Sequence, residues 1–451
     1  MLTRTDGHQM KLYYGTIDDL MPEDHFLRDL DRLVDFSFIY DLVGDLYAST
    51  GRPSVDPVVI VKMLLIGYLY GIDSERKLER EIRVNIAYRW FLGFELDDPI
   101  PDHTTLSQLR RRKFHCSTLF QDIFDKVVRR CMEEGLVTGK LLLTDSTHIR
   151  ANARNDLREI IEVTDEPTEY MKKLDQEAYK SGLIKEPVTY DTEKTREITQ
   201  SVTDPESGLL HRPGKPNAFC YLDHQTCDAE NGIITDVYVT PGNVHDAVPH
   251  TGRLEYQIDK FDFPTEAICA DASYDSGEVY NAMMKRKIKA LIPTREFPQA
   301  GAKFSEGFDR TAFSYDCTKD VYICPAGKEM YYFSYSKSNR RKKYHTSRGT
   351  CMNCPYRQQC IGDSSNARVM ERHLHAEAQE LQRRNVGTEL YEHALRLRKI
   401  WCEGNFSHQK EEHNLRRTRM RGIEKVTEQC LLSACALNLK RFVRCMKKAA
   451  V

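Results

Sequence analysis

The stretch KLLLTDSTHIRAN, from Lys140 to Asn152, sets the interpretation of the rest of the chain. Its first residues, Leu141 to Thr144, predict a buried strand. The strand runs directly into Asp145, and a carboxylate at the edge of an apolar core is costly unless another group pairs with it. An Asp after an apolar run is most often a turn or cap residue. Evidence for a distant partner of Asp145 must therefore be sought in the rest of the sequence.

Beyond this stretch, strands and helices alternate, which predicts an α/β core. NAFCYLDHQTCDA and IITDVYVTPGN predict a hairpin that turns at residues 230–232. HDAVPHTGRLEYQID and GEVYNAMMKRK predict helices, and IKALIPT predicts a strand. Another apolar strand, EAICADASYDS, runs into Asp271. Ligands gather at the carboxyl ends of strands in such sheets, so Asp145 and Asp271 would share one edge if their strands are neighbours.

Two carboxylates held together cannot both stay ionised without a partner. A divalent cation satisfies them, and ligands that are all oxygen atoms suit Mg²⁺ or Mn²⁺. The segment RLRKIWCEGNFSHQK supplies a third acid, Glu403, among the cations Arg396, Arg398, Lys399 and Lys410. An acid among bases suits a site that holds metals and grips phosphates. For Glu403 alone, an ion pair on a helix surface is the commoner use.

The composition limits the possible partners. The 451 residues carry a net charge of −1, so bulk charge points to no ligand. Basic residues are nevertheless clustered, in QLRRRKFH, SYSKSNRRKKYHTSR and NLRRTRMRG. Separate basic clusters in a neutral protein indicate an extended polyanion site, although each alone could be a solvated helix face. The candidate phosphate contacts are Arg110, Arg111, Arg112, Arg398, Lys399, Lys410, Arg416 and Arg417.

The chain contains 14 cysteines but begins without an apolar signal segment, and its longest apolar run falls short of a membrane span. We therefore expect a cytoplasmic protein with no membrane contact and with mostly free thiols. Four cysteines, Cys324, Cys351, Cys354 and Cys360, lie in a polar region and could form one structural zinc site. His345 and His373 are alternative ligands, and burial of the thiols as small apolar groups is the alternative to zinc.

Several phrases, taken in order, resemble those of bacterial insertion-sequence transposases of the DDE class. They are TDSTHIRANA, TPGNVHDA, ADASYDS and CEGNFSHQK, followed by LRRTRMRGIEKV and LNLKRF. The upstream GRPSVDPVVIVKMLLIGYLYGI and PDHTTLSQLRRR are similar to the helical N-terminal domain of the same transposases. The resemblance covers nearly the whole chain.

The resemblance implies an α/β fold with a mixed-sheet, RNase H-like catalytic core, a helical N-terminal domain and a small cysteine-rich insertion. Asp145, Asp271 and Glu403 match the acidic triad of the family, and Lys410 matches a Lys seven residues after the Glu. Many relatives place a Tyr and an Arg upstream of the Glu. Here Arg396 and Lys399 stand at those positions, with Arg398 adjacent to Lys399. We therefore expect the contacts to the DNA ends to differ in detail from those of the family.

The expected domains follow from these observations. Residues 1–130 form the helical DNA-binding domain, and 137–295 form the first part of the catalytic core, including a polar excursion over 153–216. Residues 296–372 form the cysteine-rich basic insertion, with little periodicity, and 373–451 complete the core with helices.

The resemblance implies DNA strand cleavage and transfer by two divalent ions. It also implies that the terminal inverted repeats and the target DNA are the partners, bound by a homodimer on paired ends near the nucleoid. Two alternatives remain: a DNA-binding relative without catalysis, and another metal-dependent nuclease of RNase H-like fold. A hydrolase with Ser146 as nucleophile is disfavoured, because the strand–turn–helix elbow around such a serine is missing.

Overall fold

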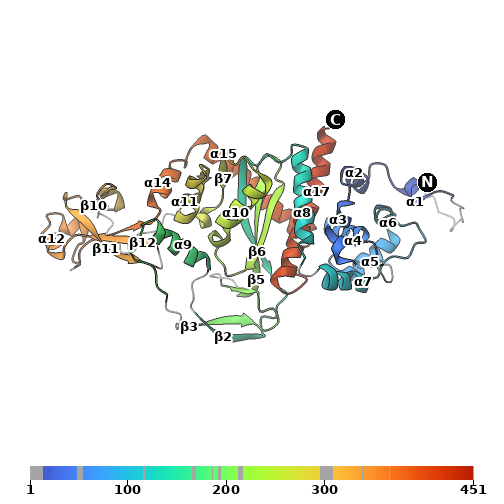
Figure 1. The fold of residues 1–451 in the computed structure, drawn as a ribbon, viewed down its shortest axis with the longest axis horizontal. Helices are drawn as coiled ribbons and strands as arrows, with labels where there is room; N and C mark the ends of the chain where they lie inside the picture. The colour runs from blue at the N-terminus through green and yellow to red at the C-terminus, as the bar shows by residue number, and fades with distance from the viewer. Residues whose placement is uncertain are drawn as a thin grey trace, which may run out of the picture.

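We describe the chain from a computed structural model (Figure 1). It describes residues 14–47, 54–114, 117–164, 169–184, 186–190, 195–211, 217–294, 308–337, 340–364 and 366–449. The parts of the expected domains that fall between these ranges lie outside the described residues. None of the helices in these ranges combines the length and hydropathy that a membrane span requires.

The N-terminal region is helical, as predicted. Its helices are α1 (Ile17–Leu20), α2 (Phe26–Leu33), α3 (Phe38–Val43), the 3₁₀ turn η1 (Gly44–Leu46), α4 (Pro57–Leu69), α5 (Glu75–Val84), α6 (Ile86–Leu92), α7 (His103–Leu109), the π turn η2 (Arg110–Phe114) and α8 (Leu119–Glu133). Helix α4 begins with Asp56, whose side chain accepts a 2.8 Å hydrogen bond from the backbone of Val58, and with Pro57 at its first position. It is apolar on nearly all sides and largely buried, so it forms the centre of this bundle.

The central mixed sheet carries the predicted α/β core. It contains β1 (Leu141–Arg150), β4 (Gly208–Leu210), β5 (Ala218–Asp228), β6 (Ile234–Pro241), β7 (Ala267–Cys269) and β8 (Lys289–Leu291). The main strands lie in the order β6-β5-β1-β7-β8, with β4 on β5. The pairs β6–β5 and β5–β1 are antiparallel, whereas β1–β7 and β7–β8 are parallel. This arrangement is the one expected of an RNase H-like core, and the predicted hairpin is β5–β6.

Helices before and after the insertion complete the core. They are α10 (Ala247–Phe261), α11 (Gly277–Lys285), α14 (Ala376–Arg383), α15 (Glu389–Arg398), the π turn η5 (Lys399–Glu403), α16 (Gly404–Glu412) and α17 (Ile423–Ala449). Helix α17 packs on β6, α8 and α4, and so joins the N-terminal bundle to the sheet (Figure 1). Its buried Asn438 forms two 2.8 Å hydrogen bonds with the backbone of Ile234, which satisfies backbone groups of β6 that no neighbouring strand in the described residues pairs.

The polar excursion is more regular than we predicted. It contains a two-stranded antiparallel sheet, β2 (Arg158–Thr164) and β3 (Thr195–Ser201), besides helix α9 (Glu169–Lys180). The strands are mostly exposed and rich in Arg, Glu and Thr. Their sequence therefore lacks the apolar alternation by which a half-buried strand is recognised.

The cysteine-rich region is also a sheet, which its weak periodicity did not predict. It contains β9 (Ser314–Asp316), β10 (Val321–Ile323), β11 (Glu329–Ser336), β12 (Arg341–His345) and β13 (Val369–His373), all antiparallel, with the short helices α12 (Arg348–Met352) and α13 (Arg357–Cys360). One face packs a small separate core around Tyr322, Met330 and Tyr344. Basic and aromatic residues fill the strands, so the polar–apolar contrast is weak.

Candidate active site

Two parallel strands bring Asp145 and Asp271 to equivalent positions, although β1 continues to Arg150, so that Asp145 lies within its strand and not at its end as the sequence predicted. The last paired residues of β1 and β7 are Leu143 and Cys269, and both are fully buried. Asp145 and Asp271 each lie two residues beyond this pair, at equivalent positions. Burial is the main cause of the raised pKa of Asp145, and the nearby carboxylate of Asp271 adds to it. The condition set from the sequence, that the strands carrying Asp145 and Asp271 are neighbours, is fulfilled by the pairing of β1 with β7.

Asp145 meets a guanidinium. Its Oδ2 lies 2.8 Å from Nη1 of Arg398 at the end of α15, and both side chains are about one-sixth exposed, at 16% and 17%. Burial raises the pKa of Asp145 to about 6, and Arg398 offsets part of this effect. Asp271 and Asp246 add to the rise, because like charges disfavour a second ionised carboxylate. Arg398 therefore serves here as the counter-charge of a partly buried acid.

Asp271 is fixed by the turn that it begins. It caps the 3₁₀ turn η3 (Ala272–Tyr274), where its Oδ1 accepts a 2.7 Å hydrogen bond from the backbone of Ser273 and another from the Ser273 hydroxyl. The short turn ADASYD thus orients this carboxylate from its own neighbours.

A third carboxylate of this site, Asp246, was missed from the sequence. It lies between β6 and α10 and accepts a 2.6 Å hydrogen bond from the hydroxyl of Ser146. The buried Tyr274 lies close to all three acids: burial raises its pKa well above the usual value, and Asp246, Asp145 and Asp271 raise it further. The phrase TPGNVHDA contains Asp246 and was part of the resemblance, but nothing in its local pattern indicated a partner on β1.

Glu403 comes from a helical element that packs against the strands of the site. It ends η5, which packs on β1 and β5, and its side chain is exposed. The preceding Cys402 is buried, with its Sγ 3.8 Å from Sγ of Cys227 on β5. Within the described ranges, no three Asp, Glu, His or Cys side chains are grouped closely enough to hold one ion. The expected convergence of three carboxyl groups is therefore not seen in this conformation.

Lys410, seven residues or about two helical turns after Glu403, reaches the same strand as Asp145. Its Nζ lies 2.5 Å from Oγ1 of Thr147. Across the strand pair, Thr147 is in register with Asp223 of β5. Asp223 is fully buried, and burial raises its pKa to about 7, although Gln225 and Lys410 oppose the rise. The Lys of the family motif thus lies beside a buried acid.

The other candidate phosphate contacts divide into two groups. Arg111, Arg112, Lys399, Arg416 and Arg417 are exposed. Arg110 is instead largely buried and forms ion pairs with Glu75 and Glu428, the second at 2.5 Å. Its guanidinium is engaged by two carboxylates from distant segments, which fits a structural link better than a phosphate contact.

The four cysteines of the predicted zinc site share one small cavity in the insertion. Burial raises the pKa of Cys360, and the neighbouring Cys351, Cys324 and Cys354 raise it further. The described side chains nevertheless show no grouping with the spacing of a metal site. His373 is engaged elsewhere: its Nε2 lies 3.3 Å from Glu278, and its Nδ1 accepts a hydrogen bond from the backbone of His375. The ring of His345 packs against Phe333.

Comparisons with known proteins identify two regions. Residues 15–112 match the family model described as a transposase domain (DUF772), and residues 323–443 match the model of a transposase DDE domain. None of the curated proteins matches the chain.

Two solved structures are similar at low identity. One is the piggyBac transposase synaptic complex with hairpin DNA, with 10% identity, a TM-score of 0.35, and coverage of 94% of this chain and 76% of that chain. The other is the Mos1 transposase paired-end complex with the left transposon end, with 8% identity, a TM-score of 0.17, and coverage of 54% and 61%.

Proposed function

Because this chain is a DDE transposase, an enzyme class that cleaves DNA and transfers its strands, we propose that Asp145, Asp271 and Glu403 are its catalytic carboxylates. The observation that carries the proposal is the parallel pairing of β1 with β7, which sets two Asp residues at equivalent positions beyond the last paired residues of these strands. The proposed substrates are the terminal inverted repeats of an insertion-sequence element and its target DNA, bound by two copies of the chain near the nucleoid.

The acids fit divalent metal ions. Asp145 and Asp271 offer carboxylate oxygens whose mutual repulsion a cation would relieve, as Mg²⁺ or Mn²⁺ would. Two such ions would activate the attacking oxygen and stabilise the leaving oxygen of an in-line phosphodiester displacement. Among the neighbouring residues, Arg398 forms an ion pair with Asp145. The hydroxyl of Ser146 donates a hydrogen bond to Asp246, and the ammonium of Lys410 contacts Thr147 on the same strand. Arg398 and Ser146 thus orient Asp145 and Asp246, and Lys410 can offer positive charge to a phosphate.

We also propose one structural zinc ion in the insertion, held by Cys324, Cys351, Cys354 and Cys360. The support is that all four line a single cavity in a module whose own core is small. Thiolates favour zinc, and binding would add to the folding energy of such a module.

The test of the catalytic proposal separates binding from cleavage. We expect Asp145→Asn, Asp271→Asn and Glu403→Gln each to abolish nicking of a duplex that carries the inverted repeat flanking the gene. Each should retain band-shift affinity within a few fold, because phosphate contacts come mainly from Lys and Arg. Glu392→Gln, at an exposed acid on α15, is the matched control and should keep wild-type nicking.

Each outcome distinguishes the alternatives. A variant that still nicks removes its residue from the triad. A wild-type protein that binds its ends in Mg²⁺ or Mn²⁺ without cutting them would be the inactive relative. One that cuts all duplexes equally would be a nuclease without end specificity.

A further inference from the structure

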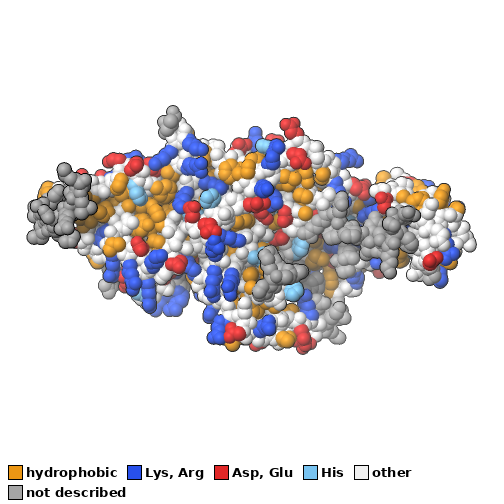
Figure 2. Space-filling model, turned by 180° about the vertical axis from the view of Figure 1, so that it is seen from behind, with side chains coloured by type: hydrophobic (Ala, Val, Ile, Leu, Met, Phe, Trp, Pro, Cys, Tyr) orange, Lys and Arg blue, Asp and Glu red, His pale blue; other side chains and the backbone are white. Residues whose placement is uncertain are grey.

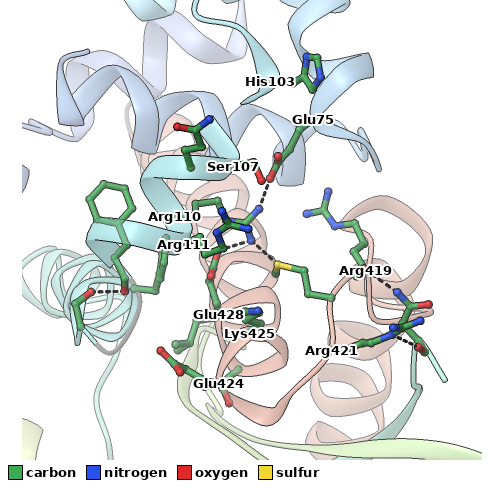
Figure 3. Close-up of a pocket in the computed structure, with 18 of the residues that line it drawn as sticks. Glu75, His103, Ser107, Arg110, Arg111, Arg419, Arg421, Glu424, Lys425 and Glu428 are labelled. Carbon is green, nitrogen blue, oxygen red and sulfur yellow. Dashed lines mark hydrogen bonds and ion pairs between the residues drawn. The ribbon is translucent and has the colours of Figure 1, made fainter. Parts of the chain in front are cut away.

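A large groove lies between the N-terminal helices and the segment that follows α16. Its volume is about 1120 Å³, and its walls come from α5, α7 and η2 on one side and from residues 419–431 on the other. Figure 3 shows Ser107 and Arg111 on one wall, with Arg419 and Arg421 opposite them. The groove is therefore built mainly from residues 73–121 and 419–431, which are far apart in the sequence, and Asn152 also lines it.

Arg110 holds the two walls together. Its guanidinium joins Glu75 of α5 to Glu428 of α17, and it also lies 3.0 Å from the sulfur of Met420 (Figure 3). These contacts engage two of the four acidic residues that line the groove, whereas basic lining residues outnumber acidic ones six to four. The groove therefore keeps an excess of positive charge, which suits a polyanion.

One wall presents a polar stripe of a helix. Helix α7 begins at Asp102, which accepts 2.8 Å hydrogen bonds from the backbones of Thr104 and Thr105, and Leu106 turns fully into the core. The groove face of this helix, which we call the α7 stripe, consists of Thr104, Ser107 and Gln108, followed by Arg111 in η2; all four are exposed and line the groove. The spacing of three, one and three places them on one helical face. Hydroxyl, amide and guanidinium groups are those that pair with base edges in the major groove.

The opposite wall presents cations. Arg421 is exposed and anchored by a 3.0 Å hydrogen bond from its Nε to the carbonyl of Asn152, which itself follows β1. Arg419 is anchored on the carbonyl of Ile72 and lies over the ring of Tyr68. Lys425 is exposed on the first turn of α17. Arg and Lys side chains are among the groups that supply the phosphate contacts of DNA-binding proteins.

We propose that the transposon-end duplex docks across the mouth of this groove, with the α7 stripe in the major groove of the DNA and with Arg419, Arg421 and Lys425 on the phosphates of one strand. The proposal rests on the proposed transposase function and assigns where the end sequence is read. The cationic wall follows α16 in the sequence and contacts Asn152, two residues after β1, so the proposed phosphate contacts are linked to the segments that carry Glu403 and Asp145.

Two variants test the two walls. The triple variant Thr104→Ala, Ser107→Ala and Gln108→Ala changes only exposed side chains and favours the helix, so it should fold. Its affinity for the inverted-repeat duplex should fall at least tenfold, with affinity for a scrambled duplex unchanged, because base contacts carry the specificity. The double variant Arg421→Ala and Lys425→Ala should weaken binding to both duplexes. The magnitude of the slope of log K against the logarithm of the salt concentration should fall by about 2. The matched control, Arg444→Ala with Lys448→Ala at the far end of α17, removes equal charge and should change neither value.

The outcomes separate this inference from the proposed function. If the triple variant discriminates between the duplexes as the wild type does, the α7 stripe is not the reading surface. If the double variant leaves DNA binding intact but disrupts self-association, the groove is a protein interface, and the inference is again overturned. Asp145→Asn tests the catalytic proposal separately. If the triple variant loses its preference for the inverted repeat but Asp145→Asn still cleaves DNA, the inference about the α7 stripe stands and only the catalytic proposal is overturned.

Discussion

Asp145 combines burial, a like-charged neighbour and a single guanidinium partner. Its pKa of about 6 means that the carboxyl is protonated, and unable to hold a cation, over much of the acidic range. The apparent affinity for Mn²⁺ should therefore fall as the pH drops below about 6, since protons and metal compete for the same oxygens.

Replacing Arg398 with Gln removes the counter-charge that opposes the pKa rise. In Arg398→Gln, we expect the decline of Mn²⁺ affinity to begin at a higher pH than in the wild type. Titration of Mn²⁺ by calorimetry between pH 5 and 8 measures this shift. Arg396→Gln, at an exposed Arg on the same helix, is the control, and equal profiles for all three proteins would contradict the assignment.

Asp223 gives a second prediction, on stability. Its pKa is raised by burial to about 7, so the folded state binds the proton more tightly than the unfolded state, where the value is about 3.9. The stability associated with this proton is complete below about pH 4 and is lost as the pH rises through about 7. An Asn side chain cannot ionise, so Asp223→Asn does not lose stability as the pH rises. We expect its Tm to exceed that of the wild type by a few degrees at pH 8 but not at pH 4.5. Thermal unfolding followed by circular dichroism at both pH values decides it, and a variant less stable at pH 8 would show that Lys410 keeps Asp223 ionised.

At the scale of elements, the sequence predicted those whose apolar pattern is strong. The buried strands around Leu143 and Ile268, the hairpin and the long helices were predicted because core residues repeat with the period of the element. The sheet of the insertion was not predicted, because its strands alternate aromatic and basic residues around a small core.

The residues of the candidate site show the same division. Asp145 and Asp271 each follow an apolar run in the sequence and could be identified, whereas Asp246 meets Ser146 across 100 residues, a contact that only the fold produces.

The cysteine-rich element gives a prediction about metal. Its core is small, so a zinc ion on the four cysteines should contribute much of its stability. We expect about one zinc per chain after dialysis against a weak chelator, and none in Cys354→Ser with Cys360→Ser. A strong chelator should expose sites in residues 308–372 to protease while the central sheet stays protected. Cys445→Ser, at a cysteine outside the module, is the control, and zinc-free protein with the same protease pattern would leave these cysteines as ordinary thiols.

At the scale of the whole molecule, charged groups from three segments join the N-terminal bundle to the core. Glu75, Arg110 and Glu428 are each at most about a quarter exposed, at 24%, 10% and 13%. Removing one partner of such a group leaves uncompensated charge in a poorly solvated place, whereas removing the whole group often costs little. This contrast makes the role of Arg110 testable.

We expect Arg110→Met to lower the unfolding free energy by about 3–5 kcal/mol, because two carboxylates then face each other without a cation. The triple variant Arg110→Met, Glu75→Gln and Glu428→Gln should recover most of that loss. Denaturant unfolding measures both, and limited proteolysis shows whether the helices before residue 115 separate from the core in the single variant. The neighbouring Arg112→Met, at an exposed position of the same π turn, should change neither. If Arg110→Met is as stable as the wild type, then packing of α4 and α8 on α17 joins the two parts without help from these charges, and Arg110 becomes available again as a DNA contact.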